Sequence, residues 1–526
     1  MDTKIFTTKD DYLQTVCGLL SEGEVVALPT ETVYGLCANA LCEKAVAKIF
    51  EAKNRPCDNP LIVHIANKND ILNLVTELPQ NAKKCIDAFW PGPFTVILNK
   101  KDIVPCVTSG GLNTVAVRMP QIEVITKVIK ESGLYLAAPS ANLSGRPSPT
   151  KASHVIEDMN GKISAIVDGG ECSVGLESTV VSFAGEHPVL LRPGFITAED
   201  ILKICPDLVI DEGVTKSVKN KKVLSPGMKY KHYAPRCDLT LVDADSDLFC
   251  KYANKFNLPA VCFKEDLKNL TGPCISLGEN PEKNLFAVLR ELDEKGYEKA
   301  IIHAPKKAGI GLALYNRMVR SCGFKEISLP LIIGLTGPSG TGKSTLTQKA
   351  SEIGFFTVDC DKVAHEVVPT LKEQLTKAFG NDIFEGEILN RKLLAQKAFL
   401  NSETTQKLND ITLPAIVLKI KEIIASCDNP LVLLDGATII ESGINNECNY
   451  VISVLCNEDI RIKRFKERDN LTEEQARLRA GARKLTEFYS QNSNYMLFNN
   501  DSVYKICNAF ENIINNILKG DLYGRL

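Results

Sequence analysis

A phosphate-binding pattern stands at residues 331–345, LIIGLTGPSGTGKST. Gly337 is followed by four residues and then by Gly342, Lys343 and Ser344, which is the spacing G-x-x-x-x-G-K-[ST]. Glycines at these positions let consecutive backbone N–H groups turn towards an anion. Lys343 can then place its charge on the outer phosphates, and the Ser344 hydroxyl can ligate Mg²⁺. The pattern predicts an ATP site made of Gly337, Pro338, Ser339, Gly340, Thr341, Gly342, Lys343, Ser344 and Thr345.

Carboxylates follow this loop at the ends of two apolar runs. Asp359 and Asp361 stand two residues apart after GFFTV, and Asp435 ends LVLLD. Asp361 could take a proton from an attacking hydroxyl or help to hold Mg²⁺, with helix capping as its alternative role. Asp435 occupies the place of a metal-linked carboxylate in phosphate-loop enzymes.

Residues 457–484 predict a basic pair of helices. Arg461, Arg464 and Arg468 fall on one helical face. A row of arginines is usually a solvated face, but beside a phosphate loop it could serve as a lid over the transferring phosphate.

A second group of polar residues lies upstream, in loops that follow short apolar runs. Lys53 and Arg55 could face one anion, although taken alone they would more often be a solvated pair. Ser178 and Arg192 lie in two further loops, and residues 138–150 are rich in Ser, Asn, Gly and Pro. Loops at strand ends line the ligand crevice of open α/β sheets, and these side chains favour a polyphosphate with a small polar co-substrate. Because no nucleophile–base pair is evident, catalysis would depend on positioning and charge neutralisation.

Apolar runs that alternate with helical patterns predict the elements that position these residues. EVVALP, LIVHI, FTVIL, TVAVR, LYLAAP, AIVD, TVVSF and VLL predict an open α/β sheet over residues 1–207, which is mixed because the last two runs are close enough for a hairpin. A polar segment at 208–237 reads as a linker. Further runs predict a small α/β domain at 238–330 and a phosphate-loop domain at 331–526.

Composition narrows the class of protein. The 526 residues are 44% hydrophobic and 24% charged, with a net charge of −2, which is typical of globular proteins and argues against a general nucleic-acid or membrane-surface binder. The eighteen cysteines form no C-x-x-C motif, the opening MDTKIFTTKD has no signal-peptide pattern, and no apolar run reaches about 18 residues. We therefore expect reduced, mostly buried thiols, a cytoplasmic location and no membrane partner.

Five motifs upstream of residue 195 resemble a known family. PTETVYGL, K-x-R-P-x-x-x-P-L, P-S-A-N-x-S-G, G-L-E-S-T-V and L-R-P-G occur in the order found in the YrdC-like threonylcarbamoyl-AMP synthases. SPGMKYKHYAP (225–235) and GIGLALYNRMVRSCG (309–323) resemble the long form, which carries an accessory C-terminal domain. The resemblance implies that L-threonine, bicarbonate or CO₂, and ATP are converted into threonylcarbamoyl-adenylate and pyrophosphate. The product would feed threonylcarbamoylation of tRNA by other proteins, without stable nucleic-acid binding by this chain.

The same resemblance assigns residues to the two substrates. It places threonine near Thr32, His64, Arg118, Ala138 and Ser178, with Arg118 on the amino-acid carboxylate. It places ATP near Arg55, Asn59, Thr114, Ser140, Ser148 and Arg192, with Lys53 near the phosphates and Tyr233 of the linker closing over the nucleotide. Lys53, Arg55 and Mg²⁺ are expected to stabilise the pyrophosphate leaving group.

The segment after residue 330 resembles dephospho-CoA kinase, a phosphate-loop fold with a parallel sheet and a helical lid. The resemblance rests on G-L-T-G-x-x-G-x-G-K-S, D-x-D, L-x-D and the pattern at residues 462–479. It implies phosphorylation of the ribose 3′-hydroxyl of dephospho-CoA, with Asp361 as base, and with Arg464 and Arg468 near the transferring phosphate. The sequence departs from the family at His365, Leu413, residues 435–441 and near Arg483. A weak kinase, a kinase with a different acceptor, and a nucleotide-binding module without kinase activity are therefore alternatives.

Two other functions compete with this interpretation. One is a tRNA- or ribosome-binding assembly protein with regulatory ATP sites, which the near-neutral charge disfavours. The other keeps the upstream α/β site but transfers a carbamoyl group to a different acceptor. Dependence on threonine, as opposed to carbamoyl phosphate, would separate the two reactions.

Overall fold

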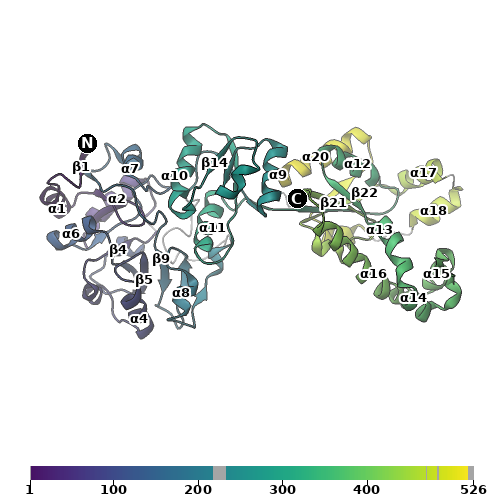
Figure 1. Cartoon of the computed structure of the whole chain (residues 1–526), viewed down its shortest axis with the longest axis horizontal. Helices are drawn as coiled ribbons and strands as arrows, with labels where there is room; N and C mark the ends of the chain where they lie inside the picture. The colour runs from purple at the N-terminus through teal and green to yellow at the C-terminus, as the bar shows by residue number, and fades with distance from the viewer. Residues whose placement is uncertain (1, 58, 217–232, 470, 482–484, 519–526) are drawn as a thin grey trace. The chain divides into compact units, whose positions relative to one another are not determined.

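The computed structural model describes residues 2–57, 59–216, 233–469, 471–481 and 485–518 (Figure 1). These residues form two compact units. The first unit comprises Met1–Asp243 and Phe256–Glu326, and the second comprises Ala244–Lys255 and Ile327–Leu526. Most of the predicted linker, including all but the end of SPGMKYKHYAP, lies outside the described residues. The bounds of the four segments proposed from the sequence stay predictions.

A mixed sheet of eleven strands organises the first unit, in the order β1-β8-β2-β3-β7-β4-β6-β5-β9-β10-β11. Its strands are β1 (Lys4–Thr7), β2 (Val26–Leu28), β3 (Gly35–Asn39), β4 (Ile62–His64), β5 (Phe94–Asn99), β6 (Thr114–Arg118), β7 (Leu136–Ala137), β8 (Ala165–Asp168), β9 (Thr179–Ser182), β10 (Val189–Arg192) and β11 (Val209–Ile210). All eight predicted runs contain a strand, and β9 pairs antiparallel with β10, so the predicted mixed sheet is confirmed.

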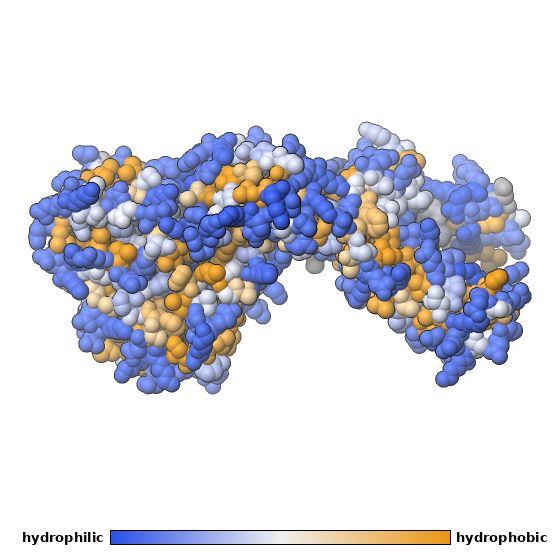
Figure 2. Space-filling model, in the orientation of Figure 1, coloured by the Kyte–Doolittle hydropathy of each residue, from blue (hydrophilic) through white to orange (hydrophobic). Residues whose placement is uncertain are grey.

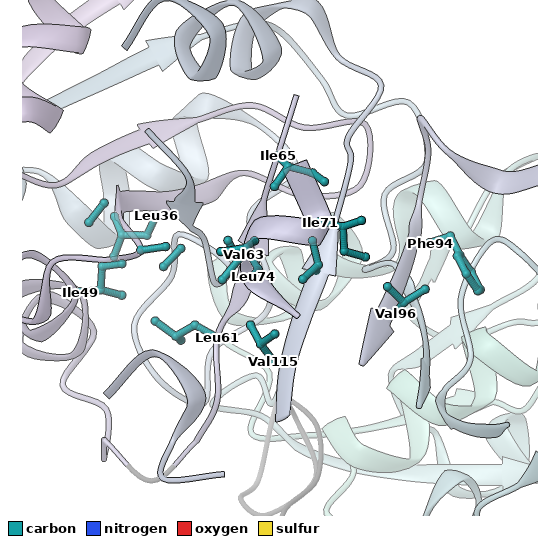
Figure 3. Packing of buried hydrophobic residues seen from close by; sticks show 14 of the residues in the cluster. Leu36, Ile49, Leu61, Val63, Ile65, Ile71, Leu74, Phe94, Val96 and Val115 are labelled. Carbon is teal, nitrogen blue, oxygen red and sulfur yellow. The ribbon is translucent and has the colours of Figure 1, made fainter. Parts of the chain in front are cut away.

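Both faces of this sheet are covered, because alternate side chains of a strand point to opposite faces. In β2, Ala27 belongs to one hydrophobic cluster, whereas Val26 and Leu28 belong to another. Figure 3 shows the first cluster, which joins Ile49 of α2 to strand residues such as Leu36 of β3 and Val63 of β4. The helices of this part are α1 (Leu13–Ser21), α2 (Glu43–Lys53), α3 (Ile71–Leu74), α4 (Gln80–Phe89), α5 (Cys106–Ser109), α6 (Glu123–Ser132), α7 (Ala152–Met159) and α8 (Ala198–Leu202).

A second, five-stranded sheet has the order β14-β13-β15-β12-β16. Its strands are β12 (Asp238–Asp243), β13 (Ala260–Cys262), β14 (Cys274–Ser276), β15 (Lys299–His303) and β16 (Glu326–Ser328). In the chain, α9 (Ser246–Phe256) follows β12, α10 (Pro281–Glu294) follows β14, and α11 (Ile310–Ser321) follows β15. We call this sheet with α10 and α11 the accessory domain. The apolar faces of both helices are buried, through Leu285 and Phe286 on α10 and Leu314 and Met318 on α11.

The second unit contains a parallel sheet, as the phosphate-loop pattern predicts, with the order β18-β21-β17-β22-β23. Its strands are β17 (Leu331–Thr336), β18 (Phe356–Asp359), β21 (Leu431–Asp435), β22 (Tyr450–Leu455) and β23 (Tyr495–Phe498), beside a small hairpin of β19 (Phe384–Glu385) and β20 (Ile388–Leu389). Its helices are α12 (Lys343–Ile353), α13 (Cys360–Val367), α14 (Lys372–Phe379), α15 (Arg391–Ala398), α16 (Ser402–Ala425), α17 (Glu458–Asp469), α18 (Glu473–Gly481), α19 (Thr486–Asn492) and α20 (Val503–Leu518).

The surface is mostly hydrophilic in the view of Figure 2, with hydrophobic residues in scattered patches. Within the described ranges, no helix combines the length and the apolar composition that crossing a membrane requires. All eighteen cysteines are free thiols, and most of them are buried, as the sequence predicts.

Candidate functional sites

A cavity opens where several strands of the eleven-stranded sheet end. Parallel pairing aligns His64 of β4 with Arg118 of β6, so two predicted residues stand side by side. The lining includes all five side chains that the resemblance assigns to threonine, namely Thr32, His64, Arg118, Ala138 and Ser178.

Arg118 is held from several sides at the floor of this cavity. Its Nη1 donates to Thr32 Oγ1 at 2.8 Å, its Nε donates to the Gly92 carbonyl at 3.3 Å, and its Nη2 lies 2.6 Å from Glu31 Oε1. Glu31 is buried and also accepts a hydrogen bond from the backbone N–H of Gln121. The guanidinium is therefore fixed in orientation, and its charge is balanced within the fold.

The neighbouring polar groups are equally constrained. Burial, together with the charge of Arg118, lowers the pKa of His64 to about 3, so its imidazole is neutral near pH 7. Ser178 Oγ lies 2.7 Å from Thr95 Oγ1 and accepts from Arg192 Nη2 at 3.1 Å. Burial lowers the pKa of Arg192 to about 10, which still leaves its guanidinium charged. The cavity thus presents a neutral imidazole beside the cationic Arg118, with the cationic Arg192 also in its lining.

Four of the residues expected near ATP line the same cavity: Arg55, Ser140, Arg192 and Tyr233. Ser148 lies behind its wall, where its hydroxyl donates to Glu177 Oε1 at 2.6 Å. Asn59 follows Arg55 by four residues and is buried, and its side-chain amide has no hydrogen-bond partner among the described residues. Thr114 begins β6, opposite Asn99 of β5, whereas Arg118 ends the strand.

Lys53 stands apart from the phosphate role expected of it. Its ammonium donates to the Ser140 carbonyl and, at 2.7 Å, to the Asn142 carbonyl, and it is not among the side chains that line the cavity. Burial, reinforced by the charge of Arg55, lowers the pKa of Lys53 well below its usual value. In this arrangement Lys53 holds the loop at 138–150 from behind.

Sequence reasoning missed three charged residues of this site. Arg146 and Glu177 line the cavity, and Glu31 pairs with Arg118 just beyond it. Glu31 lies inside PTETVYGL, Glu177 lies inside G-L-E-S-T-V, and Arg146 directly follows P-S-A-N-x-S-G. The available signal was an ionisable residue within an otherwise hydroxyl- or glycine-rich stretch, because such a residue is buried only when it has a partner.

The second unit contains an open cleft around the phosphate-binding loop between β17 and α12. The loop requires its glycines. Gly337 has φ +132° and a Cβ there would lie 2.2 Å from the Val454 carbonyl oxygen, while Gly342 has φ +96° and its Cβ would lie 2.3 Å from Asn499 Nδ2. Lys343 Nζ donates to the Gly337 carbonyl at 2.8 Å, so the lysine is curled into the loop.

Asp359, Asp361 and Asp435 all line this cleft together with Lys343 and Ser344. Asp359, not Asp361, caps α13, since Asp359 Oδ1 accepts from the Lys362 backbone N–H at 3.0 Å. Burial, followed by the nearby charge of Asp359, raises the pKa of Asp361. Asp435 Oδ2 accepts from Thr347 Oγ1 at 2.6 Å. The capping alternative for Asp361 is therefore not realised, and its carboxylate borders the cleft.

Helix α17 brings its arginine face to the loop. Arg461 is 1% exposed and donates to the Ser339 and Ala480 carbonyls, and Arg464 donates to the Gly340 carbonyl at 3.0 Å. Arg468 lines the cleft while its guanidinium forms two hydrogen bonds to Asp469. On the neighbouring helix α18, Arg477 Nη2 lies 3.0 Å from Glu473 Oε1.

The departures from the kinase pattern lie on different elements. His365 is in α13, where its Nδ1 lies 2.8 Å from the Asp361 carbonyl, and its own carbonyl accepts from Arg391. Leu413 and Pro414 are inside the long helix α16. Arg483 lies outside the described residues.

Comparison with known proteins matches three successive segments of the chain to three families. Residues 18–194 match the family described as "Telomere recombination", residues 196–323 match "Threonylcarbamoyl-AMP synthase, C-terminal domain", and residues 331–505 match "Dephospho-CoA kinase". A threonylcarbamoyl-AMP synthase of Pyrococcus abyssi is 44% identical over 330 residues, covering 60% of this chain and 96% of that protein. A dephospho-CoA kinase of Fusobacterium nucleatum is 33% identical over 150 residues, covering 28% of this chain and 77% of that protein.

A solved structure extends the likeness to three dimensions. The crystal structure of Pyrococcus abyssi Sua5 complexed with L-threonine has a TM-score of 0.57 and 41% identity, and the match covers 62% of this chain and 100% of that one. The chain is therefore an enzyme of the threonylcarbamoyl-AMP synthase family, and its polypeptide continues into a domain of the dephospho-CoA kinase family.

Proposed function

We propose that the first unit makes L-threonylcarbamoyladenylate and pyrophosphate from L-threonine, bicarbonate or CO₂, and ATP. The observation that carries the proposal is the cavity itself, because the five side chains assigned to threonine and four of those assigned to ATP line one space. The product would then pass to the proteins that threonylcarbamoylate tRNA. A solved relative that is complexed with L-threonine supports the choice of amino acid.

Arg118 would orient the amino acid. A guanidinium carries five N–H groups, and its two terminal nitrogens carry two each. Thr32 accepts one hydrogen bond from Nη1 and Glu31 pairs with Nη2 as an ion pair, which leaves N–H groups on both terminal nitrogens for the threonine carboxylate. Because Glu31 already balances the charge, Arg118 would contribute mainly geometry, which is what an in-line reaction needs.

Arg55 would neutralise the phosphates during the transfer. The threonine carbamate oxygen would form a bond to the α-phosphorus while the bond from that phosphorus to the bridging oxygen breaks, so that pyrophosphate leaves with the electron pair. Arg55 and Arg192 line the cavity and can stabilise charge on these oxygens. Lys53 would act on the same step by holding the Ser140 carbonyl and its loop in place.

A magnesium ion would fit this cavity as a companion of the nucleotide. Glu177 is the sole carboxylate among the described lining residues, and it is engaged by Arg317 at 3.0 Å. A Mg²⁺ ion would therefore be held chiefly by phosphate oxygens, where it supplies charge neutralisation.

Release of pyrophosphate from ATP by the full chain, with formation of threonylcarbamoyladenylate, tests this proposal. We expect the reaction to require both threonine and bicarbonate, and Arg55→Ala to lower pyrophosphate release at least 100-fold. Carbamoyl phosphate should not replace threonine and bicarbonate. A wild-type rate in the Arg55→Ala protein, or salt-sensitive tRNA binding without threonine-dependent ATP cleavage, would reject it.

The second unit supports a second function, phosphorylation of the 3′-hydroxyl of dephospho-CoA by ATP. The observation that favours it is the position of Asp361, a carboxylate with a raised pKa in the cleft that also contains Lys343 and Ser344. Asp361 would accept the proton of the attacking hydroxyl. The oxygens of Ser344 and Asp435 suit Mg²⁺, which would supply charge neutralisation at the phosphates.

Formation of CoA from dephospho-CoA and ATP by the full chain tests this second function. Lys343→Ala should abolish CoA formation, whereas Arg55→Ala should impair only threonine-dependent pyrophosphate release. Intact ATP binding without any CoA would instead indicate a nucleotide-binding module without this acceptor.

A further inference from the structure

Helix α11 of the accessory domain contains buried polar side chains that the proposed mechanism does not use. Asn316, Arg317 and Arg320 are 2%, 0% and 6% exposed. Asn316 donates to the Val214 carbonyl at 2.6 Å, and Arg320 donates to the Gly213 carbonyl at 2.7 Å. A guanidinium is very costly to bury without partners, so the contacts of Arg317 identify what this helix recognises.

Arg317 binds the loops that form one wall of the synthase cavity. Its Nε donates to Glu177 Oε2 at 3.0 Å, its Nη2 donates to the Glu177 carbonyl at 3.3 Å, and its Nη1 donates to the Pro193 carbonyl at 2.6 Å. One side chain therefore ties the loop before β9 to the loop after β10. These loops also touch directly, since a Cβ on Gly194 would lie 2.5 Å from the Thr179 backbone nitrogen.

The contacts continue from Glu177 into the cavity. Its other carboxylate oxygen accepts from the Ser148 hydroxyl at 2.6 Å, and the next residue, Ser178, binds Arg192 through both its carbonyl and its hydroxyl. Although burial alone would raise the pKa of Glu177, the charges of Arg317 and Arg192 lower it, so the carboxylate stays ionised. Arg317 itself does not line the cavity.

A second buried arginine of the accessory domain repeats this arrangement. Arg290 of α10 is 2% exposed, lies 2.7 Å from Asp158 Oδ2 and donates to the Pro147 carbonyl at 2.7 Å. Asp158 in turn lies 2.5 Å from Arg146, which lines the cavity. Arg317 thus contacts the cavity residue Glu177 directly, whereas Arg290 reaches the cavity residue Arg146 through the buried carboxylate of Asp158.

We propose that Arg317 is a positioning residue for the synthase reaction, through which the accessory domain fixes Glu177 and, with it, the cavity wall that contains Ser178 and Arg192 and is supported from behind by Ser148. The inference rests on the proposed function of the first unit for the identity of the substrates. All the residues whose contacts carry the inference belong to that unit. The accessory domain is then a structural part of the active site, although it contributes no contact to substrate through this arginine.

A double-mutant cycle between Arg317→Met and Glu177→Gln tests this inference. The full chain is used in a Lys343→Ala background, so that the second unit does not contribute a nucleotide site. We expect each single variant to raise the KM for ATP at least tenfold, and the double variant to be no more than about twofold worse than the worse single variant. Arg317→Lys should restore part of the affinity, because an ammonium can reach only some of these acceptors.

Arg320→Met is the matched control, since it removes a buried arginine of the same helix that donates to the Gly213 carbonyl. Its effect should multiply with that of Glu177→Gln. The inference is overturned if Arg317→Met lowers only the melting temperature while the KM for ATP stays at the wild-type value under conditions where the variant is folded. It is equally overturned if the effects of Arg317→Met and Glu177→Gln multiply.

Binding of a non-hydrolysable ATP analogue, measured by calorimetry in the same background, separates this inference from the proposed reaction. Absence of threonine-dependent turnover in the wild type would reject the reaction. The analogue would still report whether Arg317 and Glu177 are coupled, with the same expected and contrary results.

Discussion

Arg118 Nη2 and Glu31 Oε1 lie 2.6 Å apart, and the two side chains are only 4% and 5% exposed. Taking two opposite charges out of water is costly, and close pairing compensates for that cost only while both partners are present. The pair therefore keeps a guanidinium at the part of the cavity that we propose for threonine, with its charge balanced by Glu31. The two residues are 87 positions apart in the sequence, so only the fold brings them together.

Replacement of Glu31 by Gln should expose this dependence. Arg118 would lose its buried counter-charge, and we expect a loss of about 3 kcal/mol in the free energy of unfolding. Because bound threonine would supply a new carboxylate, saturating threonine should raise the melting temperature of the variant more than that of the wild type. Thermal unfolding with and without threonine measures both effects.

The control is Glu24→Gln, which breaks a partly exposed pair with Lys48. That change should cost less than about 1 kcal/mol. An unchanged melting temperature in Glu31→Gln would show that Arg118 does not rely on Glu31.

His64 should make the protein less stable in acid without acting as a titrating group in catalysis. Its pKa of about 3 in the folded protein is below the value of about 6.5 in an unfolded chain. As the pH falls below 6.5, the unfolded state takes up a proton that the folded state does not, so stability falls by about 2 kcal/mol between pH 6.5 and 5. His64→Gln should remove this component.

Urea unfolding at pH 7 and pH 5 measures the difference between the wild type and His64→Gln. His154, whose pKa burial lowers to about 4, contributes with the same sign in both proteins and cancels in the comparison. An NMR titration that showed His64 protonating between pH 6 and 7 would contradict the prediction.

The relation between Lys53 and Arg55 shows why the sequence could predict the site only in part. Alternate spacing suggested that both face one anion, but α2 ends at Lys53 and Asn54 adopts φ +52° in the left-handed region. The chain reverses there, so Lys53 turns to the loop carbonyls and Arg55 lines the cavity. A local pattern does not specify this reversal.

Strands and ion pairs were predictable to different degrees for a related reason. Apolar runs predicted the strands that are buried on both faces, such as β4 and β17, because the pattern is local. β3, with the sequence GLCAN, was missed because small residues give little strand signal. The pairs Glu31–Arg118 and Glu177–Arg317 join residues far apart in sequence, and nothing in the neighbouring residues specifies the partner.

Lys53→Met and Arg55→Ala should therefore have different kinetic signatures. Loss of the Lys53 ammonium would free the loop at Ser140 and Asn142, and we expect the KM for ATP to rise about tenfold with a smaller change in kcat. Loss of Arg55 should mainly lower kcat, because its charge acts on the leaving pyrophosphate. Initial rates of pyrophosphate release at varied ATP measure both constants. Equal falls in kcat for both variants would restore a direct phosphate contact for Lys53.

Asp361→Asn should separate chemistry from stability in the second unit. If Asp361 is the base, CoA formation should fall 10²- to 10⁴-fold. Since burial raises the pKa of Asp361, the folded protein disfavours its charge, and the neutral amide should leave the melting temperature equal or higher. The wild-type rate should also fall as the pH is lowered towards this pKa, whereas the residual rate of the variant should not.

The threonine-dependent reaction of the same protein serves as the internal control for Asp361→Asn, because it reports the first unit. CoA formation at the wild-type rate would exclude Asp361 as the base.

Two arginines of α17 should affect different steps of phosphoryl transfer. Arg461 joins the Ser339 carbonyl of the phosphate loop to the Ala480 carbonyl of α18, and a lysine cannot span both. One buried carbonyl left unsatisfied costs about 1–3 kcal/mol, so Arg461→Lys should raise the KM for ATP about tenfold and lower the melting temperature.

Arg468 is 61% exposed, and its pairing with Asp469 contributes little to stability. If Arg468 is a lid residue that meets the transferring phosphate, Arg468→Ala should instead lower kcat about 10²- to 10³-fold at an unchanged melting temperature. Lys463→Met is the matched control, since this 76% exposed side chain of the same helix pairs only loosely with Glu467 at 3.9 Å and should change neither constant. A wild-type kcat for Arg468→Ala would remove Arg468 from the lid, and a wild-type KM for Arg461→Lys would show that the loop does not depend on this bridge.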